Sequence, residues 1–320
     1  MMMRIALTIM ALALATVAKA EDYPSRPITL LVPAAPGGGN DVVARVIADK
    51  LGQLLGQPVV VENRGGAGGT FAARQVAKSA PDGYTLGLGN PATLAIAPTT
   101  LPNVGYDPRT DFAPVGLIAS SPHLVMVYPG LPAHSLQELI ALAKQDPGGL
   151  TFASGGAGSP THLGPELLAV MAGIKIRHIP YKGTGPALAD LVGGHVSIAF
   201  SSVPAAMGLV RSGQVRALAI TSATRSSLFP DIPTVAEAGV PGYESAQRYG
   251  IIAPAHTPRP IIDKLNAALR EALASPEVKA RLAAEGAEPL ASSPEDYAAD
   301  IDREEAKWSK IIRQLAAKPE

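Results

Sequence analysis

Short apolar runs alternate with segments of helical periodicity over the first third of the chain. Residues 30–32, 59–61 and 84–88 have the length and composition of buried strands. Between the first two runs, apolar residues recur at helical spacing, and a further helix is predicted from 70 to about 79. Apolar strands separated by helices predict a parallel sheet that is covered by helices on both faces.

The same alternation resumes in the middle of the chain and gives way to helices at the end. Strands are predicted at 115–118, 124–127, 150–153, 174–179, 196–200, 215–221 and 249–253. Helices are predicted after a capping box at 135–138, and at 161–171, 260–274, 276–285 and 294–315, with Ser159, Ser275 and Ser293 as caps. Because 320 residues exceed what one core usually organises, the pattern predicts an α/β protein with two domains.

The first twenty residues have the order of a secretory signal peptide. A short basic start is followed by an apolar run at 5–17 and by the small-x-small sequence Ala18-Lys19-Ala20, which predicts cleavage after Ala20. The apolar run is too short to span a bilayer, although an uncleaved N-terminal anchor is an alternative. The mature protein is therefore expected to be exported, which in a bacterium means the periplasm.

Composition excludes several classes of function. The chain has no cysteine, so disulfides, thiol catalysis and thiolate metal sites are excluded. Its 27 basic and 27 acidic residues balance, so no nucleic acid and no anionic membrane is indicated as a partner. Glycine and proline are frequent but dispersed among periodic segments, which indicates many tight turns.

Two glycine-rich loops carry the most informative chemistry. Residues 33–41 (Pro-Ala-Ala-Pro-Gly-Gly-Gly-Asn-Asp) join a strand to a helix, and residues 154–160 (Ser-Gly-Gly-Ala-Gly-Ser-Pro) do the same in the second half. Glycines leave such a loop bare, so a ligand can approach the N–H groups of the loop and of the first helical turn. That arrangement favours binding of an anion. The alternative is that the glycines serve only the tight turns.

The sequence lacks the motifs of nucleotide-binding sites, of serine hydrolases and of histidine metal sites. Neither loop has the Lys-Ser/Thr ending of a P-loop, and residues 66–71 miss the third glycine of a dinucleotide fingerprint. The chain contains no Gly-x-Ser-x-Gly motif and no His-Glu-x-x-His motif, and its six histidines are scattered. We therefore expect no catalytic residues, no metal site and no cofactor.

Single residues near the loops have two interpretations each. Asp41 stabilises the start of its helix or contacts the ligand. His162, in the first turn after Ser159, packs or donates to an anion. The cluster Pro180-Tyr181-Lys182-Gly183 is a solvated turn or a cationic contact, and Arg248 is a surface residue or pairs with a ligand carboxylate.

A series of motifs occurs in a fixed order along the chain. They are the loop 33–41, Val59-Val60-Val61-Glu62-Asn63-Arg64 with Gly66-Ala67-Gly68-Gly69, Ala80-Pro81-Asp82-Gly83-Tyr84-Thr85-Leu86, Tyr106-Asp107-Pro108 with Asp111-Phe112-Ala113-Pro114-Val115, Pro180-Tyr181-Lys182-Gly183, Pro230-Asp231-Ile232-Pro233-Thr234-Val235-Ala236-Glu237, and Ala253-Pro254 near Thr257-Pro258. In these motifs the chain resembles the solute-binding proteins of tripartite tricarboxylate transporters, the Bug family of periplasmic receptors. The resemblance covers essentially all of the mature chain.

The resemblance implies a Venus-flytrap fold of the type II periplasmic-binding kind. Each of its two lobes is expected to hold a mostly parallel sheet flanked by helices. Residues 21–121 and 249–320 would form the first lobe and residues 122–248 the second, with crossovers near 120–124 and 247–249.

The resemblance also implies the function. The family captures a small organic acid between the lobes and presents it to a membrane permease without chemistry, and we expect a monomer. With Asp41, His162 and Arg248, the expected ligand contacts are Ala35, Gly37, Gly38, Asn90 and Thr93 in the first lobe, and Ser154, Gly155, Ser159, Thr161, Tyr181, Lys182 and Ser201 in the second.

Three positions depart from the family pattern and refine the expected ligand. Ser201-Ser202 follows Phe200 where an aspartate is common, Arg248 precedes Tyr249 where an aromatic residue is common, and Pro91-Ala92 replaces Asn-Gly. Losing an acid and gaining an arginine predicts a more positive pocket. Our hypothesis is that a dicarboxylate is preferred, with its second carboxylate opposite Arg248.

Two other functions remain possible at this point. One is an exported α/β enzyme that acts on a small acid in the same cleft, and the other is a receptor that feeds a sensor kinase. The sequence leaves the acid itself open, because backbone groups that bind a ligand leave little trace in residue types.

Overall fold

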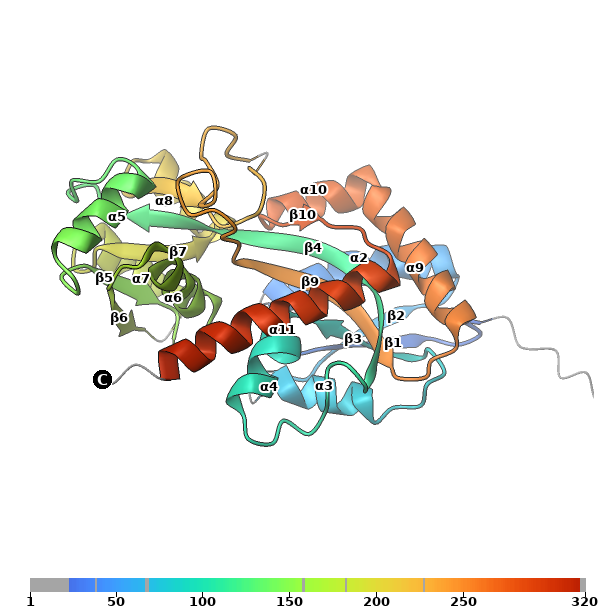
Figure 1. Cartoon of the computed structure of the whole chain (residues 1–320). Helices are drawn as coiled ribbons and strands as arrows, with labels where there is room; N and C mark the ends of the chain where they lie inside the picture. The colour runs from blue at the N-terminus through green and yellow to red at the C-terminus, as the bar shows by residue number, and fades with distance from the viewer. Residues whose placement is uncertain are drawn as a thin grey trace, which may run out of the picture.

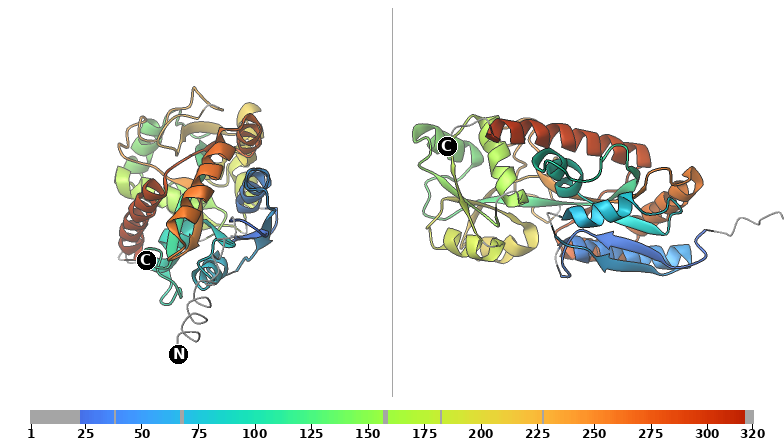
Figure 2. Two further views of the ribbon diagram at one scale, coloured as in Figure 1. Left: turned by 90° about the vertical axis from the view of Figure 1, so that its right-hand side faces the viewer. Right: turned by 90° about the horizontal axis from the view of Figure 1, so that it is seen from below.

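The structure is a computed structural model that describes residues 23–37, 39–66, 69–156, 159–181, 183–226 and 228–316. The predicted signal peptide (1–20) and two predicted site residues, Gly38 and Lys182, lie outside the described residues. The molecule has two lobes that lie end to end, as the view from below makes clear (Figure 1, Figure 2).

The first lobe is built on parallel strands flanked by two antiparallel ones. Strands β1 (Ile28–Val32), β2 (Val59–Asn63) and β3 (Thr85–Gly89) are parallel, in the order β2-β1-β3. Strand β9 (Ala246–Pro254) pairs antiparallel with β3, and β4 (Phe112–Val127) pairs antiparallel with β9. The short β10 (Glu288–Pro289) adds to the other side of β4.

The second lobe repeats this plan. Strands β5 (Thr151–Ser154), β6 (Arg177–Pro180) and β7 (Ile198–Ser202) are parallel, with β5 between the other two. Strands β7 and β8 (Arg216–Ile220) each pair antiparallel with the end of β4. Each lobe therefore has the predicted parallel strands, and antiparallel strands join the lobes.

A single long strand connects the two sheets. The sequence predicted two strands, 115–118 and 124–127. That prediction was wrong: β4 runs through these residues, since β9 supplies partners as far as Pro122 and β7 supplies them from His123. The backbone at the junction is thus paired throughout, although the exact lobe boundaries stay a prediction.

Helices cover both faces of each sheet. In the first lobe, α2 (Gly39–Leu55), α9 (Arg259–Ala274) and α10 (Pro276–Ala284) pack on one core cluster, and α3 (Thr70–Ala77) with α11 (Pro294–Ala316) packs on the other. In the second lobe, α5 (Leu136–Gln145) and α6 (Pro160–Ala172) share one cluster, and α7 (Thr184–Val192) and α8 (Val203–Arg211) share the other. Caps at Ser135, Ser275 and Ser293 are confirmed.

Several short helices escaped sequence reasoning. They are the π-helix η2 (Ala92–Ile96), the adjoining α4 (Ala97–Thr100), α7 and α8. All except η2 contain a proline at the second or third helical position, and Pro91 directly precedes η2. Proline is well tolerated in the first turn of a helix, so its presence in these segments is compatible with short helices.

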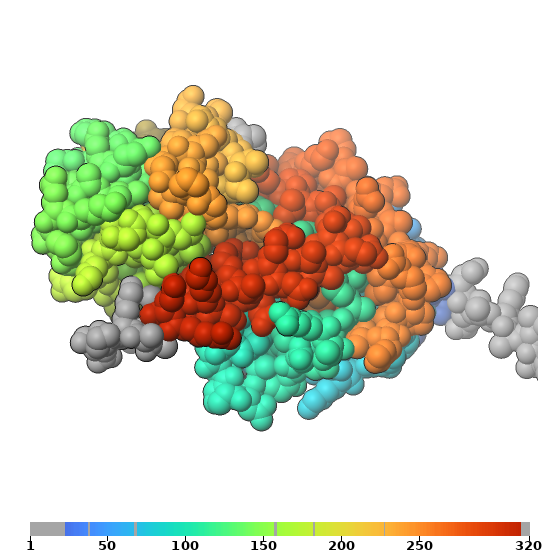
Figure 3. All heavy atoms as spheres, in the orientation of Figure 1, coloured from blue at the N-terminus to red at the C-terminus, as the bar shows by residue number. Residues whose placement is uncertain are grey.

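The C-terminal helix α11 contacts both lobes. Tyr297 and Ile301 belong to a core cluster of the first lobe, while Trp308 and Ile311 belong to a cluster of the second. The helix lies across one side of the molecule, over the junction of the lobes (Figure 3). It therefore connects the lobes in addition to β4 and β9.

We predict that Gly250→Ala will disturb the docking of α11. A β-carbon at Gly250, on β9, would lie 2.3 Å from the Tyr297 ring, so the substitution should lower the free energy of unfolding by about 1–3 kcal/mol. In the control Gly208→Ala, on α8, the β-carbon meets nothing within 4 Å and should be neutral or stabilising by about 0.5–1 kcal/mol. Urea denaturation compares the two, and equal stabilities would contradict this packing.

Candidate functional site

Three loops gather at the carboxyl edge of the first lobe's parallel strands. A β-carbon at Gly65, after β2, would lie 3.4 Å from the backbone of Ala34 and Ala35, after β1. Gly69 has φ +89°, and a β-carbon there would lie 2.7 Å from Pro33 and 2.9 Å from Thr93, after β3. The structure thus brings the loops that carry Ala35 and Thr93 together.

Asp41 organises the loop before α2. Its carboxylate accepts hydrogen bonds from the Gly37 N–H (2.8 Å), Arg45 Nε (3.0 Å) and Asn63 Nδ2 (3.0 Å). The side chain of Asp41 is only 5% exposed, and the hydrogen bond from Arg45 lowers its pKa to about 2, with smaller contributions from Gly37 and Asn63. The carboxylate is therefore ionised and engaged within the protein, which favours the interpretation that Asp41 shapes the loop.

Asn90 ties the turn after β3 to the start of α2. Its Oδ1 accepts from the Thr93 N–H (3.0 Å), while its Nδ2 donates to Asn40 Oδ1 (2.9 Å). Thr93 Oγ1 in turn donates to the Asn90 carbonyl (3.1 Å). This turn leads into the π-helix η2. Helices of this type are rare in proteins, but where they occur they are often at functional sites.

The second glycine-rich loop is organised by its own hydroxyl groups. The Gly155 N–H donates to Thr161 Oγ1 (2.9 Å), and Ser159 Oγ donates to the Gly156 carbonyl (2.6 Å) and lies 3.0 Å from Thr161 Oγ1. Ser159 occupies the N-cap position of α6, as predicted, but its hydroxyl does not accept a capping hydrogen bond from a backbone N–H of the helix. These hydrogen bonds tie the described residues of the loop to the first turn of α6.

Three stacked rings lie behind this loop. The rings of His162 and His178 are 4.1 Å apart, and the Phe152 ring is 4.8 Å from that of His178. Burial, and to a smaller extent His178, lowers the pKa of His162 to about 4, so His162 is neutral near pH 7. His178 Nε2 lies 2.6 Å from Ser154 Oγ, a contact that sequence reasoning missed because it places residues 24 apart on neighbouring strands.

Two further predicted residues, Tyr181 and Ser201, have side-chain hydroxyls that are engaged or buried within the protein. The Tyr181 N–H donates to the Ser154 carbonyl (3.0 Å), but its hydroxyl donates to Asp190, which raises the pKa of Tyr181 to about 12. Ser201 is fully buried, and among the described residues its Oγ is the only wholly buried side-chain oxygen or nitrogen without a hydrogen-bond partner.

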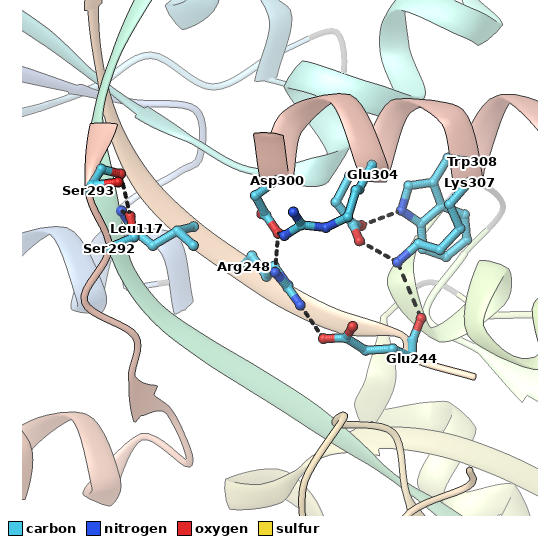
Figure 4. Close-up of polar contacts among 10 residues, drawn as sticks. Leu117, Glu244, Arg248, Ser292, Ser293, Asp300, Glu304, Lys307 and Trp308 are labelled. Carbon is cyan, nitrogen blue, oxygen red and sulfur yellow. Dashed lines mark hydrogen bonds and ion pairs between the residues drawn. The ribbon is translucent and has the colours of Figure 1, made fainter. Parts of the chain in front are cut away.

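Arg248 requires a correction. Its guanidinium pairs with Glu244 and with Asp300 of α11 (Figure 4). The Asp300 side chain is 4% exposed and also binds Arg303 (2.8 Å). The expectation that Arg248 makes the pocket more positive was wrong, because two carboxylates already face it. The preference for a dicarboxylate, which rested on that charge, loses its support.

No metal site emerges from the described parts of the chain. There, His, Asp and Glu side chains do not gather in groups of three or more that could hold a metal ion. A helix able to cross a bilayer is likewise absent from the described ranges. The chemistry that remains at both loops is that of backbone N–H groups and hydroxyls at helix N-termini.

Comparison with known proteins decides the family. Residues 43–317 match the family model described as "Tripartite tricarboxylate transporter family receptor". The chain belongs to this family. This confirms the resemblance inferred from the motifs, and family members are substrate-binding receptors.

Individual relatives agree with this assignment. BugT of Bordetella pertussis is 43% identical over 300 residues, which cover 93% of this chain and 92% of BugT. The structure of R. palustris Rpa4515 with adipate is 41% identical, covers 91% of this chain and 98% of its own, and has a TM-score of 0.76. MatC (Rpa3494) from Rhodopseudomonas palustris with bound malate is 36% identical, covers 91% and 100%, and has a TM-score of 0.73. The two-lobe fold is thereby confirmed.

We predict that Asp41→Asn destabilises this receptor in a pH-dependent manner. Because the pKa of Asp41 is lowered in the folded state, its contribution is complete above its ordinary pKa near 3.8 and is lost as the pH falls towards 2. At pH 6 the variant should lose about 1–2 kcal/mol of unfolding free energy, and the difference should shrink at pH 3.

The control is Asp49→Asn on the same helix. Asp49 pairs with Arg281 at 3.0 Å, but both side chains are largely exposed, so less than about 1 kcal/mol should be lost. Urea denaturation at pH 6 and at pH 3 measures the unfolding free energy of the wild-type protein and of both variants. A pH-independent loss for Asp41→Asn would contradict the role given to its charge.

Proposed function

We propose that this protein is a periplasmic receptor that captures a small carboxylate between its lobes and delivers it to a tripartite tricarboxylate-type permease. One observation carries the proposal: each lobe presents a long helix, α2 or α6, whose first turn follows a glycine-rich loop at the end of a parallel strand. Such helix starts combine unpaired N–H donors with the positive end of the helix dipole, and both favour an anion.

The chemistry of the relatives supports a carboxylate as that anion. Rpa4515 holds adipate and MatC holds malate, and both acids are small and carry two carboxylates. In this chain Asp41 does not oppose such a ligand, because Arg45 lies 2.9 Å from its carboxylate and compensates the charge. We expect the receptor to act as a monomer, without a cofactor and without nucleic acid.

An enzymatic role is the second candidate, because one pair resembles an activated nucleophile. Ser154 Oγ lies 2.6 Å from His178 Nε2, the arrangement in which a histidine activates a hydroxyl. However, Ser154 is only 1% exposed, and its hydroxyl also accepts from the Gly156 N–H (3.1 Å). A nucleophile must reach its substrate, so we assign this pair to loop organisation and propose that the bound acid is released unchanged.

We predict that a panel of organic acids will identify the ligand by thermal shift. The panel contains malate, adipate, succinate, citrate, benzoate and aspartate, and an acid present at about 100 times its Kd should add roughly 2.7 kcal/mol of stability. Thr161→Val should weaken binding about tenfold, because the glycine-rich loop then loses the hydrogen bond from the Gly155 N–H to the Thr161 hydroxyl that orders it.

Thr110→Val serves as the matched control, since Thr110 is exposed and lies outside both loops. Chromatography of the acid recovered after incubation tests whether it is unchanged. If no acid stabilises the protein, or if a product appears, the receptor function is wrong.

The proposed export makes a separate prediction. Cleavage after Ala20 should leave a mature chain that begins at Glu21. The mass of the protein from a periplasmic extract measures this directly. A chain that retains residues 1–20 in the membrane fraction would show an N-terminal anchor in place of a cleaved signal.

A further inference from the structure

Tyr249 lies next to Arg248 on β9 but faces the opposite side of the sheet. Successive residues of a strand point to opposite faces. Arg248 therefore meets α11, whereas the Tyr249 ring belongs to the core cluster that contains Val43 and Ile47 of α2. Tyr249 is only 6% exposed, so its ring is a fixed part of this core.

The hydroxyl of Tyr249 reaches the first residue of α2. A β-carbon at Gly39 would lie 3.2 Å from the Tyr249 hydroxyl oxygen, which is closer than an ordinary van der Waals contact. The φ angle of Gly39 is not in the left-handed region that favours glycine. The approach of the hydroxyl thus gives a physical reason for glycine at this position.

This hydroxyl has no hydrogen-bond partner within the described ranges, as is also the case for the buried Tyr297, whereas two other buried tyrosines have one. Tyr243 donates to the Gly164 carbonyl (3.0 Å), and Tyr106 donates to the Thr93 carbonyl (2.5 Å). Among the described residues, only one wholly buried polar side-chain atom lacks a hydrogen-bond partner, and it is Ser201 Oγ. The Tyr249 hydroxyl is not such an enclosed atom, and the first residue of α2 lies beside it.

The position suits a hydrogen bond to an anion. Helix α2 has 17 residues, and its first N–H groups lack intrahelical acceptors. Burial, with a smaller effect from Glu285, raises the pKa of Tyr249 far above its ordinary value, so the hydroxyl stays protonated and able to donate. An acceptor at the helix start would satisfy both the N–H groups and the hydroxyl.

We propose that the Tyr249 hydroxyl binds a carboxylate oxygen of the ligand at the start of α2, an inference that rests on the proposed function. One carboxylate then bridges the first helical turn and the hydroxyl. Since every acid of the panel carries such a group, Tyr249 contributes to the recognition of a carboxylate in general. It does not distinguish acids with one carboxylate from acids with two.

Tyr249→Phe tests this proposal, because it removes the hydroxyl and keeps the ring. Calorimetric titration with malate, adipate and any other acid of the panel that binds should show a 10- to 100-fold loss of affinity, as expected for a hydrogen bond to a charged group. The loss should be similar for acids with one and with two carboxylates. The melting temperature without ligand should stay the same or rise, since no hydrogen bond of the protein is removed.

Tyr243→Phe is the matched control. It removes a hydroxyl that does have a partner, so the melting temperature should fall while the affinity stays within about twofold. Gly39→Ala gives an independent test of the geometry. Its methyl group would crowd the Tyr249 hydroxyl, so it should weaken binding more in the wild-type background than in Tyr249→Phe.

The outcomes separate this inference from the proposed function. If the wild-type protein binds an acid and Tyr249→Phe binds it equally well, the role of the hydroxyl is wrong and the receptor function stands. A loss of affinity accompanied by an equal loss of stability without ligand would also overturn the role. If the wild-type protein binds no acid of the panel, both proposals fail.

Discussion

The first turn of an α-helix leaves its N–H groups without acceptors in the helix, and the architecture of this receptor depends on where two such turns lie. Helices α2 and α6 each follow a parallel strand, β1 or β5, after a short loop rich in glycine and other small residues. Side chains from several elements make hydrogen bonds to the described residues of these loops. Asp41, Arg45 and Asn63 do so in the first lobe, and Ser154, Ser159 and Thr161 do so in the second.

The connections between the lobes determine how the two helix starts can approach each other. Strands β4 and β9 pass from one sheet towards the other, and α11 packs on both lobes. At the junction, Arg248 links β9 to Asp300, while Lys307 Nζ donates to the Glu244 carbonyl (3.2 Å). Closure on a ligand, the usual response of hinged two-lobe receptors, has to be accommodated by these contacts. Arg248 is thus better understood as part of the junction than as part of the ligand site.

Much of the fold could be predicted from local sequence patterns. Apolar periodicity located most strands and the longer helices, and the serine caps at 135, 275 and 293 marked helix starts correctly. The errors share a physical cause. The sequence predicts one strand on each side of Ser120-Ser121-Pro122, but pairing with β9 and β7 keeps the strand continuous, and such pairing between distant segments has no local signal.

The candidate site was predictable only in part, for a related reason. The glycine loops are visible in the sequence, and the structure places Asp41 and Asn90 at the first of them and Ser154 and Thr161 at the second. Arg248 and Tyr249 are neighbours on β9 and point to opposite faces of the sheet, and the sequence alone does not show which of them lies on the side of α2. The structure places Tyr249 on that side and Arg248 against α11. The partners Asn63 and His178 also escaped notice, since each reaches its loop from a neighbouring strand.

A crystal structure of the mature protein with its bound acid is the most direct test of the central claim. Our account predicts a carboxylate within hydrogen-bond distance of the first turn of α2, with the first turn of α6 contacting the same molecule from the other lobe. An acid lodged instead beside Arg248 and α11, or one that touches neither helix start, would contradict it.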